Sequence, residues 1–118
     1  MPTDSFKRKL AAIFSTDVVG YSRMMGDNEA ETVKTLQIYK EVMFTFIKQQ
    51  RGRVIDSTGD NLLGEFGSVV DVVQCTVAVQ KDVQVRNTEL PENRRMQFRI
   101  GINLGDVLRR EIGFTGMV

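Results

Sequence analysis

The sequence has no histidine and no tryptophan, and its one cysteine is Cys75. Without histidine, a Ser-His-Asp triad, a histidine-ligated zinc site and imidazole acid–base catalysis are excluded. One cysteine cannot form an internal disulfide, which is typical of a cytoplasmic protein. The metal ligands that remain are oxygen atoms, and these favour Mg²⁺, Mn²⁺ or Ca²⁺.

Long apolar runs and a strong net charge are missing as well. No stretch approaches the roughly 18 apolar residues of a membrane helix, so we expect no membrane span. The apolar run at 10–14 is also shorter than the core of a secretory leader, which takes about 7–15 residues. The net charge of +1 provides no general field that would attract nucleic acid, and no nucleic-acid partner is expected. The 118 residues, 42% of them hydrophobic, are enough for one domain with its own core.

The hydrophobic pattern predicts strands and helices in alternation. The short unbroken apolar run at 10–14 is typical of a strand in the middle of a sheet. Apolar and polar side chains alternate over 96–104, which indicates a half-buried strand. The valine-rich segment at 69–86 is predicted to be helical because strands rarely exceed about 10 residues. The predicted elements are, in chain order, a strand at 10–14, a short helix at 18–26, a long helix between Asn28 and Gly52, a hairpin at 53–66, a helix at 69–86 and a strand at 96–104.

Each long helix carries a cap signal and an apolar face. Asn28 with Glu31, and Ser68 with Asp71, have the form of N-caps, and Gly52 has the form of a C-terminal stop. The apolar faces contain Val33, Leu36, Met43, Phe46 and Ile47 in the first long helix, with Lys34, Lys40 and Lys48 mostly off the face, and Val69, Val70, Val73 and Val77 in the second.

This order of elements predicts an α+β fold, the ferredoxin-like β-α-β-β-α-β unit with an antiparallel sheet and both helices on one face. Right-handed crossovers then place the first strand beside the third. Asp17 follows the first strand and Asp60 lies in the hairpin turn before the third, so we expect the two carboxylates to meet. The predicted organisation is a flexible arm at 1–8, the domain at 9–108 and a divergent tail at 109–118.

Asp17 and Asp60 together would favour a divalent cation, because two close carboxylates do not both stay ionised cheaply. Mg²⁺ usually takes one or two carboxylates and completes its shell with phosphate oxygens. The segment after Asp17 opens a helix whose free N–H groups would face an anion, and Gly20 lets the backbone approach it closely. Each aspartate also fits an ordinary role, Asp17 as a helix cap and Asp60 as a turn residue, and spacing alone leaves both interpretations open.

Three stretches resemble, in order and in spacing, the class III adenylate/guanylate cyclase catalytic domain of alpha-proteobacterial type: RKLAAIFSTDVVGYSRMMGDNEAET, GRVIDSTGDNLLGEF and FRIGINLGDV. The resemblance covers 8–107. It implies that Asp17 and Asp60, with the carbonyl of Val18, bind two Mg²⁺ or Mn²⁺ ions. The residues that it implies in nucleotide binding are Val19, Gly20, Tyr21, Ser22, Asp56 and Gly59.

The resemblance also implies a reaction and a partner. In the family, the ribose 3′-hydroxyl of ATP or GTP attacks the α-phosphate and releases pyrophosphate. Each site is built from two chains, so a homodimer, or a heterodimer with another cyclase domain, is expected. Asp56 stands where adenylate cyclases usually carry a lysine and guanylate cyclases a glutamate, and a carboxylate accepts rather than donates hydrogen bonds. The choice between ATP and GTP therefore stays open.

The tail departs from the family pattern. Family members continue past LGDV to an Asn and then an Arg that act on the transition state, and RREIGFTGMV has neither at the family's positions. From Arg110, one choice of codons for this tail encodes GDRIYGDGV in a second frame, which is how family members continue. We therefore expect an off-frame tail and impaired catalysis, a hypothesis that the nucleotide sequence of the gene tests. The alternative is a non-catalytic, nucleotide-binding regulator that pairs with another cyclase.

Overall fold

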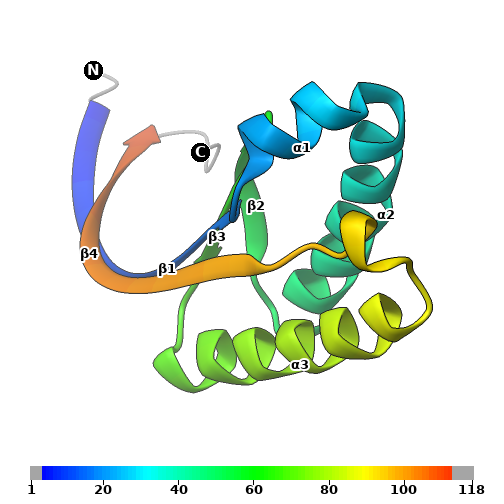
Figure 1. Cartoon of the computed structure of the whole chain (residues 1–118). Coiled ribbons are helices and arrows are strands. Elements are labelled where there is room, and N and C mark those ends of the chain that lie inside the picture. Colours follow the sequence, from blue (N-terminus) through cyan, green and yellow to red (C-terminus); the bar gives the residue numbers. More distant parts are fainter. Residues whose placement is uncertain (1–3, 113–118) are drawn as a thin grey trace.

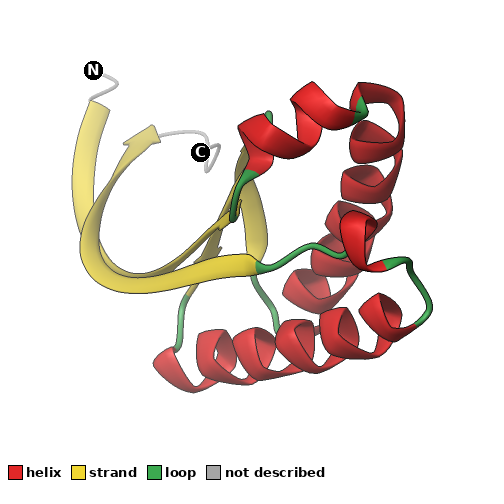
Figure 2. Cartoon of the chain, in the orientation of Figure 1, coloured by secondary structure: helices red, strands yellow, loops and turns green. Residues whose placement is uncertain are grey.

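The fold is α+β, with one four-stranded antiparallel sheet and the long helices on one side of it (Figures 1 and 2). The computed structural model describes residues 4–112. The elements are β1 (Asp4–Val18), α1 (Tyr21–Asp27), α2 (Glu29–Gln49), β2 (Arg53–Thr58), β3 (Asn61–Phe66), α3 (Val69–Thr88), the 3-10 turn η1 (Glu92–Arg94) and β4 (Phe98–Ile112). The strand order is β2-β3-β1-β4, so the first strand lies beside the third, as the ferredoxin-like order predicts.

β1 occupies the centre of the sheet, because it pairs with β3 on one side and with β4 on the other. Phe14 and Val18 are buried in the core beneath the helices, whereas Ser15 and Asp17 are only partly buried. This alternation turns the polar side chains at the end of the strand toward the opposite face of the sheet. The predicted central strand is confirmed, although Leu10 at its start is 63% exposed.

β1 and β4 extend together past the rest of the sheet. β1 pairs with β3 only over 12–16, whereas its pairing with β4 continues over the whole length of both strands. The outer parts of the two strands form a two-stranded ribbon that leads away from α2 and α3 (Figure 1). β1 thus begins inside the predicted arm at 1–8, and β4 ends inside the predicted tail at 109–118, because each strand satisfies the backbone of the other. Residues 113–118 lie outside the described part of the chain.

The core lies between the sheet and the two long helices. Phe14 and Phe66 meet edge to face with ring centroids 6.5 Å apart, and Tyr39 and Phe98 do so at 5.5 Å. The Tyr39 hydroxyl donates to the side chain of Asn87 at 2.5 Å, which ties α2 to α3. Burying one such large apolar side chain stabilises the fold by about 1.5–3 kcal/mol.

The two ends of α2 differ in how well the sequence predicts them. Asn28 is the predicted N-cap, and its side chain accepts the N–H of Glu31 at 3.1 Å. At the other end, the residue with a left-handed backbone is Arg51, with φ 62°. Gly52 was predicted to end the helix in this conformation, and it does not adopt it. A Cβ on Gly52 would lie 2.5 Å from Cε2 of Phe66. Gly52 therefore permits close packing of the backbone on an aromatic ring.

The apolar face of α2 includes a lysine that the sequence prediction left outside it. Leu36, Met43 and Ile47 are buried as predicted, but Val33 is 48% exposed. Lys40 is only 8% exposed, so its assignment to the polar side of the helix is wrong. Lys40 follows Leu36 by four positions and precedes Met43 by three, and this spacing places it on the buried stripe.

α3 is helical as predicted, but a different face of it is buried. Ser68 caps the helix, and its side chain accepts the N–H of Asp71 at 3.4 Å. The valines that the sequence predicted to form the apolar face do share one face of the helix, but this face is exposed to solvent. The buried face contains Val72, Cys75, Val79 and Val83, and the exposed face contains Val69, Val70, Val73 and Val77.

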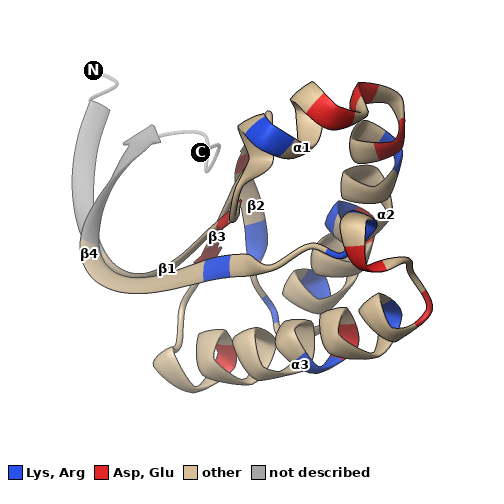
Figure 3. Ribbon diagram, viewed as in Figure 1, with Lys and Arg blue, Asp and Glu red and all other residues tan. Residues whose placement is uncertain are grey.

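Charged residues of both signs are interspersed over the described helices and strands (Figure 3). The net charge is +1, and in the view of Figure 3 positions of both signs are mixed along the ribbon. Within residues 4–112, no helix is both long enough and apolar enough to cross a membrane.

Candidate functional site

The end of β1 and the turn between β2 and β3 come together in the structure. The backbone N–H of Val18 donates to Oδ2 of Asp60 at 3.1 Å, although the two residues are 42 positions apart. The turn is tight, since Thr58 pairs with Asn61 across it, and Gly59 has a left-handed φ of 57° that glycine adopts without strain. Asp60 is therefore aimed at the backbone that follows Asp17.

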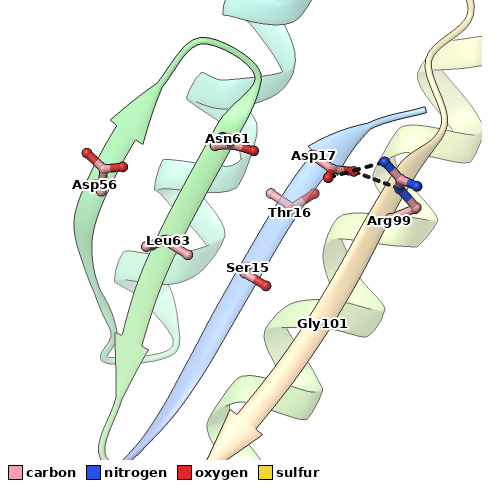
Figure 4. Close-up of a pocket in the computed structure, with 8 residues that line it drawn as sticks. All are labelled: Ser15, Thr16, Asp17, Asp56, Asn61, Leu63, Arg99 and Gly101. Atoms are coloured by element: carbon pink, nitrogen blue, oxygen red, sulfur yellow. Dashed lines mark hydrogen bonds and ion pairs between the residues drawn. The ribbon is translucent and has the colours of Figure 1, made fainter. Parts of the chain in front are cut away.

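Arg99 holds the carboxylate of Asp17. Its Nε and a terminal guanidinium nitrogen donate to the two oxygens of Asp17 at 2.9 and 3.3 Å, as Figure 4 shows. Asp17 and Arg99 face one another in the register of β1 and β4. The hydrogen bond to Asp17 raises the pKa of Arg99. Arg99 was not among the predicted site residues, and its only signal was a place in a strand that ends beside Asp17 in the predicted sheet.

A cavity of about 410 Å³ lies on the face of the sheet away from the helices (Figure 4). It crosses all four strands, because each strand contributes at least one lining residue. Gly101 leaves space in the cavity because it has no side chain, and a Cβ there would come within 3.2 Å of the Ser15 hydroxyl. The residues that line the cavity are Ser15, Thr16, Asp17, Asp56, Asn61, Leu63, Arg99 and Gly101.

Asp56 enters this cavity through an irregularity of β2. The pairing with β3 shifts between Val54 and Asp56, so that Asp56 stands opposite Leu63. A β-bulge of this kind re-aims the side chain that follows it. The hydroxyl of Thr58 donates to Oδ1 of Asp56 at 3.1 Å and fixes one of its oxygens. Nothing in the sequence pattern signals the bulge.

The predicted phosphate seat at 19–22 lies in the turn from β1 into α1. Gly20 has a left-handed φ of 70°, and α1 begins at the next residue, Tyr21. The N–H of Val19 donates to the carbonyl of Gln97 at 2.9 Å, so this N–H is already engaged. The helix therefore starts later than the sequence predicts, with Ser22 in its first turn.

Lys40 lies beneath the turn that carries Asp60. Its ammonium donates to the Ser57 hydroxyl at 2.9 Å and to the carbonyl of Gly59 at 2.5 Å. Burial lowers the pKa of Lys40, and the nearby carboxylates of Asp60 and Asp56 partly oppose that effect. Sequence reasoning missed this residue, although its phase on α2 indicated a buried position.

The donors at this site suit a hard divalent cation. Oδ1 of Asp60 makes no hydrogen bond or ion pair within the described residues, whereas both oxygens of Asp17 are engaged by Arg99. Over the described ranges, no group of three or more His, Cys, Asp or Glu side chains gathers to form a complete protein cage. Mg²⁺ and Mn²⁺ commonly take one or two carboxylates and complete their shell with phosphate oxygens, so Asp17 and Asp60 are donors of the kind that fit such an ion.

Known proteins share this arrangement of sequence and fold. A Rhizobium meliloti protein, named as a candidate adenylate cyclase 3, is 43% identical to the chain over 117 residues, or 98% of the chain and 20% of that protein. The solved adenylate/guanylate cyclase/hydrolase of Silicibacter pomeroyi is 34% identical, with a TM-score of 0.79, over 89% of the chain and 62% of the solved one. The chain belongs to the class III adenylate/guanylate cyclase family.

Two further cyclase structures have the same fold. The guanylyl cyclase Cya2 is 26% identical with a TM-score of 0.75, over 91% of this chain and 64% of Cya2. A dimeric guanylyl cyclase domain from Blastocladiella emersonii is 17% identical with a TM-score of 0.73, over 92% of this chain and 63% of that one, a likeness of fold alone. The chain spans 20% of the Rhizobium relative and less than two thirds of the three solved cyclase structures. No protein-family model matches the chain.

Within this cyclase domain, the residues predicted for the site fall into three places. Val18 and Asp60 are in direct contact, and Gly59 forms the turn beside them. Asp17 and Asp56 line the adjoining cavity. The helix start at 19–22 lies next to Val18, but the Val19 N–H belongs to the protein's own hydrogen bonding.

Proposed function

We propose that this chain carries the metal-binding and nucleotide-binding part of a nucleotidyl cyclase site, which converts ATP or GTP to a cyclic nucleotide and pyrophosphate. The observation that carries the proposal is the hydrogen bond from the Val18 N–H to Asp60. This bond holds Asp60 at the end of β1, the strand that carries Asp17. A cavity of about 410 Å³, which Asp17 helps to line, offers room for part of a nucleotide.

Each residue has a distinct task in this proposal. Asp17 and Asp60, with the carbonyl of Val18, hold Mg²⁺ or Mn²⁺, and the helix start at Gly20 and Tyr21 faces the triphosphate. Bound metal would supply the charge that neutralises the triphosphate and lowers the pKa of the ribose hydroxyl. The protein contributes by fixing the ligands before substrate arrives, so that little ordering is needed on binding.

Asp56 is proposed to face the purine. It lines the cavity together with Asn61, and its hydrogen bond from the Thr58 hydroxyl to Oδ1 leaves the second carboxylate oxygen for an incoming donor. A carboxylate accepts hydrogen bonds, which suits the N1–H and amino group of guanine better than the N1 acceptor of adenine. We therefore propose that GTP binds more tightly than ATP.

A second chain completes the site in this proposal. The cavity lies on the sheet face that the helices leave uncovered, so one side of a bound nucleotide would stay open to solvent in a single chain. A second cyclase domain, identical or different, would cover that side. We propose that this assembly acts in the cytoplasm, where the nucleotide triphosphates and Mg²⁺ are available.

A second candidate function is a nucleotide-binding regulator that pairs with an active cyclase without turning over itself. The observation that favours it is the ion pair in which Arg99 engages both oxygens of Asp17. A metal ion must share or displace that guanidinium before it reaches Asp17. If the exchange is incomplete, nucleotide binds without the two-ion geometry that the reaction requires.

A product assay separates the two candidates. Purified chain is incubated with Mn²⁺ and either ATP or GTP, alone and together with a full-length homologous cyclase, and cyclic nucleotide is quantified. Product from the chain alone that Asp17→Asn abolishes supports the enzyme. Altered output of the homologue, without product from the chain alone, supports the regulator. Glu41→Gln, on the exposed side of α2, is the matched control. The cyclase proposal fails if the wild type neither forms product nor binds nucleotide.

A further inference from the structure

Lys40 is a buried cation whose hydrogen bonds both go to one short turn. The residue is 8% exposed and lies in line with the buried Leu36 and Met43 on α2. A buried charge is costly unless it is paired and hydrogen-bonded. Here the ammonium reaches the Ser57 hydroxyl and the Gly59 carbonyl, at 2.9 and 2.5 Å. The Lys40 side chain thus extends from the buried face of α2 to the tip of the β2–β3 hairpin.

The turn needs support because little else in the protein touches it. Ser57, Thr58 and Gly59 are exposed, and a Cβ built on Gly59 would meet nothing within 4 Å. Among the side chains that the structure describes, those of residues 10–105, Lys40 is the one from outside the hairpin that donates hydrogen bonds to 57–59. The next residue, Asp60, is held from the side by the Val18 N–H.

We propose that Lys40 is a positioning residue, which anchors the β2–β3 turn from below so that the Asp60 carboxylate faces the end of β1. The role of Asp60 toward metal rests on the function proposed above, whereas the anchoring of the turn does not. Lys40 touches neither metal nor nucleotide in this proposal and acts only through the backbone that leads into Asp60.

The sign of one measurement distinguishes positioning from simple electrostatics. A cation near Asp60 repels a divalent ion, so if charge were all that Lys40 contributed, removing it would tighten metal binding. If Lys40 holds the turn in place, removing it makes the position of the Asp60 carboxylate less well fixed and therefore weakens metal binding. Partners that orient a metal ligand typically contribute about 10- to 100-fold in affinity.

The test compares Lys40→Met, which loses charge and donors, with Lys40→Gln, which loses charge but keeps amide donors. Lys48→Met, at an exposed position of the same helix, is the control. Mn²⁺ binding is measured from the electron paramagnetic resonance signal of the free ion. Exchange of the Val18 amide proton is followed by NMR without metal, because that proton is bonded to Asp60.

We expect Lys40→Met to weaken Mn²⁺ binding by about tenfold and to speed Val18 exchange by about tenfold, with Lys40→Gln in between and Lys48→Met unchanged. Unchanged Val18 exchange in both Lys40 variants overturns the inference, and so does tighter Mn²⁺ binding in both. If Lys40→Met does not fold, Lys40→Gln carries the comparison. If the wild type binds no Mn²⁺, the proposed function fails, and the exchange rates still decide whether Lys40 anchors the turn.

Discussion

Arg99 donates to both carboxylate oxygens of Asp17 across the β1–β4 ladder, at 2.9 and 3.3 Å. The pair is partly open to solvent, with the Arg99 side chain 71% exposed and that of Asp17 37% exposed. Exposed ion pairs contribute about 0–1 kcal/mol, so this one is a small part of fold stability. Its main effect is on what else Asp17 can bind.

Replacing Arg99 is expected to tighten metal binding. The backbone of Asp17 pairs with β4 and lies between Thr16, which pairs with both neighbouring strands, and Val18, whose N–H is bonded to Asp60, so it does not need the guanidinium to stay in place. Arg99→Gln removes a competing positive charge, and we expect the dissociation constant for Mn²⁺ to fall by about 3- to 10-fold at low salt. Arg95→Gln, also exposed, is the control in the same titration. Weaker Mn²⁺ binding in Arg99→Gln would mean that Arg99 orients Asp17 for the ion.

Two substitutions of Asp60 separate its structural bond from its role as a ligand. Asp60→Asn keeps an oxygen that can accept the Val18 N–H, so its melting temperature should stay within about 2 °C of the wild type. It should still lose about tenfold or more in Mn²⁺ affinity, because an amide is a poorer ligand than a carboxylate. Asp60→Ala loses both functions, leaves the Val18 N–H without its partner and should cost about 1–3 kcal/mol. Equal Mn²⁺ affinity in the wild type and Asp60→Asn would remove Asp60 from the metal site.

Gly52→Ala should destabilise the fold through a steric clash. The added Cβ would lie 2.5 Å from Cε2 of Phe66, and this ring is fully buried and cannot move aside freely. Overpacking of a core of this kind costs about 1–3 kcal/mol, which urea denaturation measures. Gly67→Ala is the matched control, because a Cβ there meets nothing within 4 Å. A Gly52→Ala variant as stable as Gly67→Ala would show that Phe66 has room to shift.

Cys75 should make the fold less stable at high pH. Burial raises the pKa of its thiol from 9.0 to about 11 in the folded protein. The unfolded chain therefore releases this proton first as pH rises, and stability present below pH 9 is lost between pH 9 and 11, by about 2–3 kcal/mol. Thermal unfolding of the wild type and Cys75→Ala across this range tests the point. The variant should show a shallower decline, and parallel curves would show that other groups cause the loss.

Local sequence signals predict most of the fold. The Asn28 cap and the turn at Gly59 depend on neighbouring residues and form as expected. The alternation from Met96 to Leu104 predicts a strand correctly, but the strand begins at Phe98, and Ile102 and Leu104 are exposed because they lie toward the two-stranded ribbon. The strand order follows from the order of elements and their handedness, which is why Asp60 could be expected beside the end of β1.

The features that the sequence left out depend on distant residues. Arg99 meets Asp17 only because of the register between two strands that are 82 positions apart at this point. The bulge that aims Asp56 depends on how β2 meets β3. Lys40 carried a usable signal in its helical phase, but the expectation that lysine stays in water outweighed it.

The two-stranded ribbon gives β1 an inner and an outer half with different exposure to proteases. Only the inner half has neighbours on both edges, so the outer half can fray without disturbing the contacts around Asp17. Lys9 and Arg109 belong to the outer parts of their strands, and trypsin cleaves the chain after lysine and arginine. A brief digestion should therefore shorten the ribbon from its open end and leave behind a trimmed domain that still carries the cavity lined by Asp17 and Asp56.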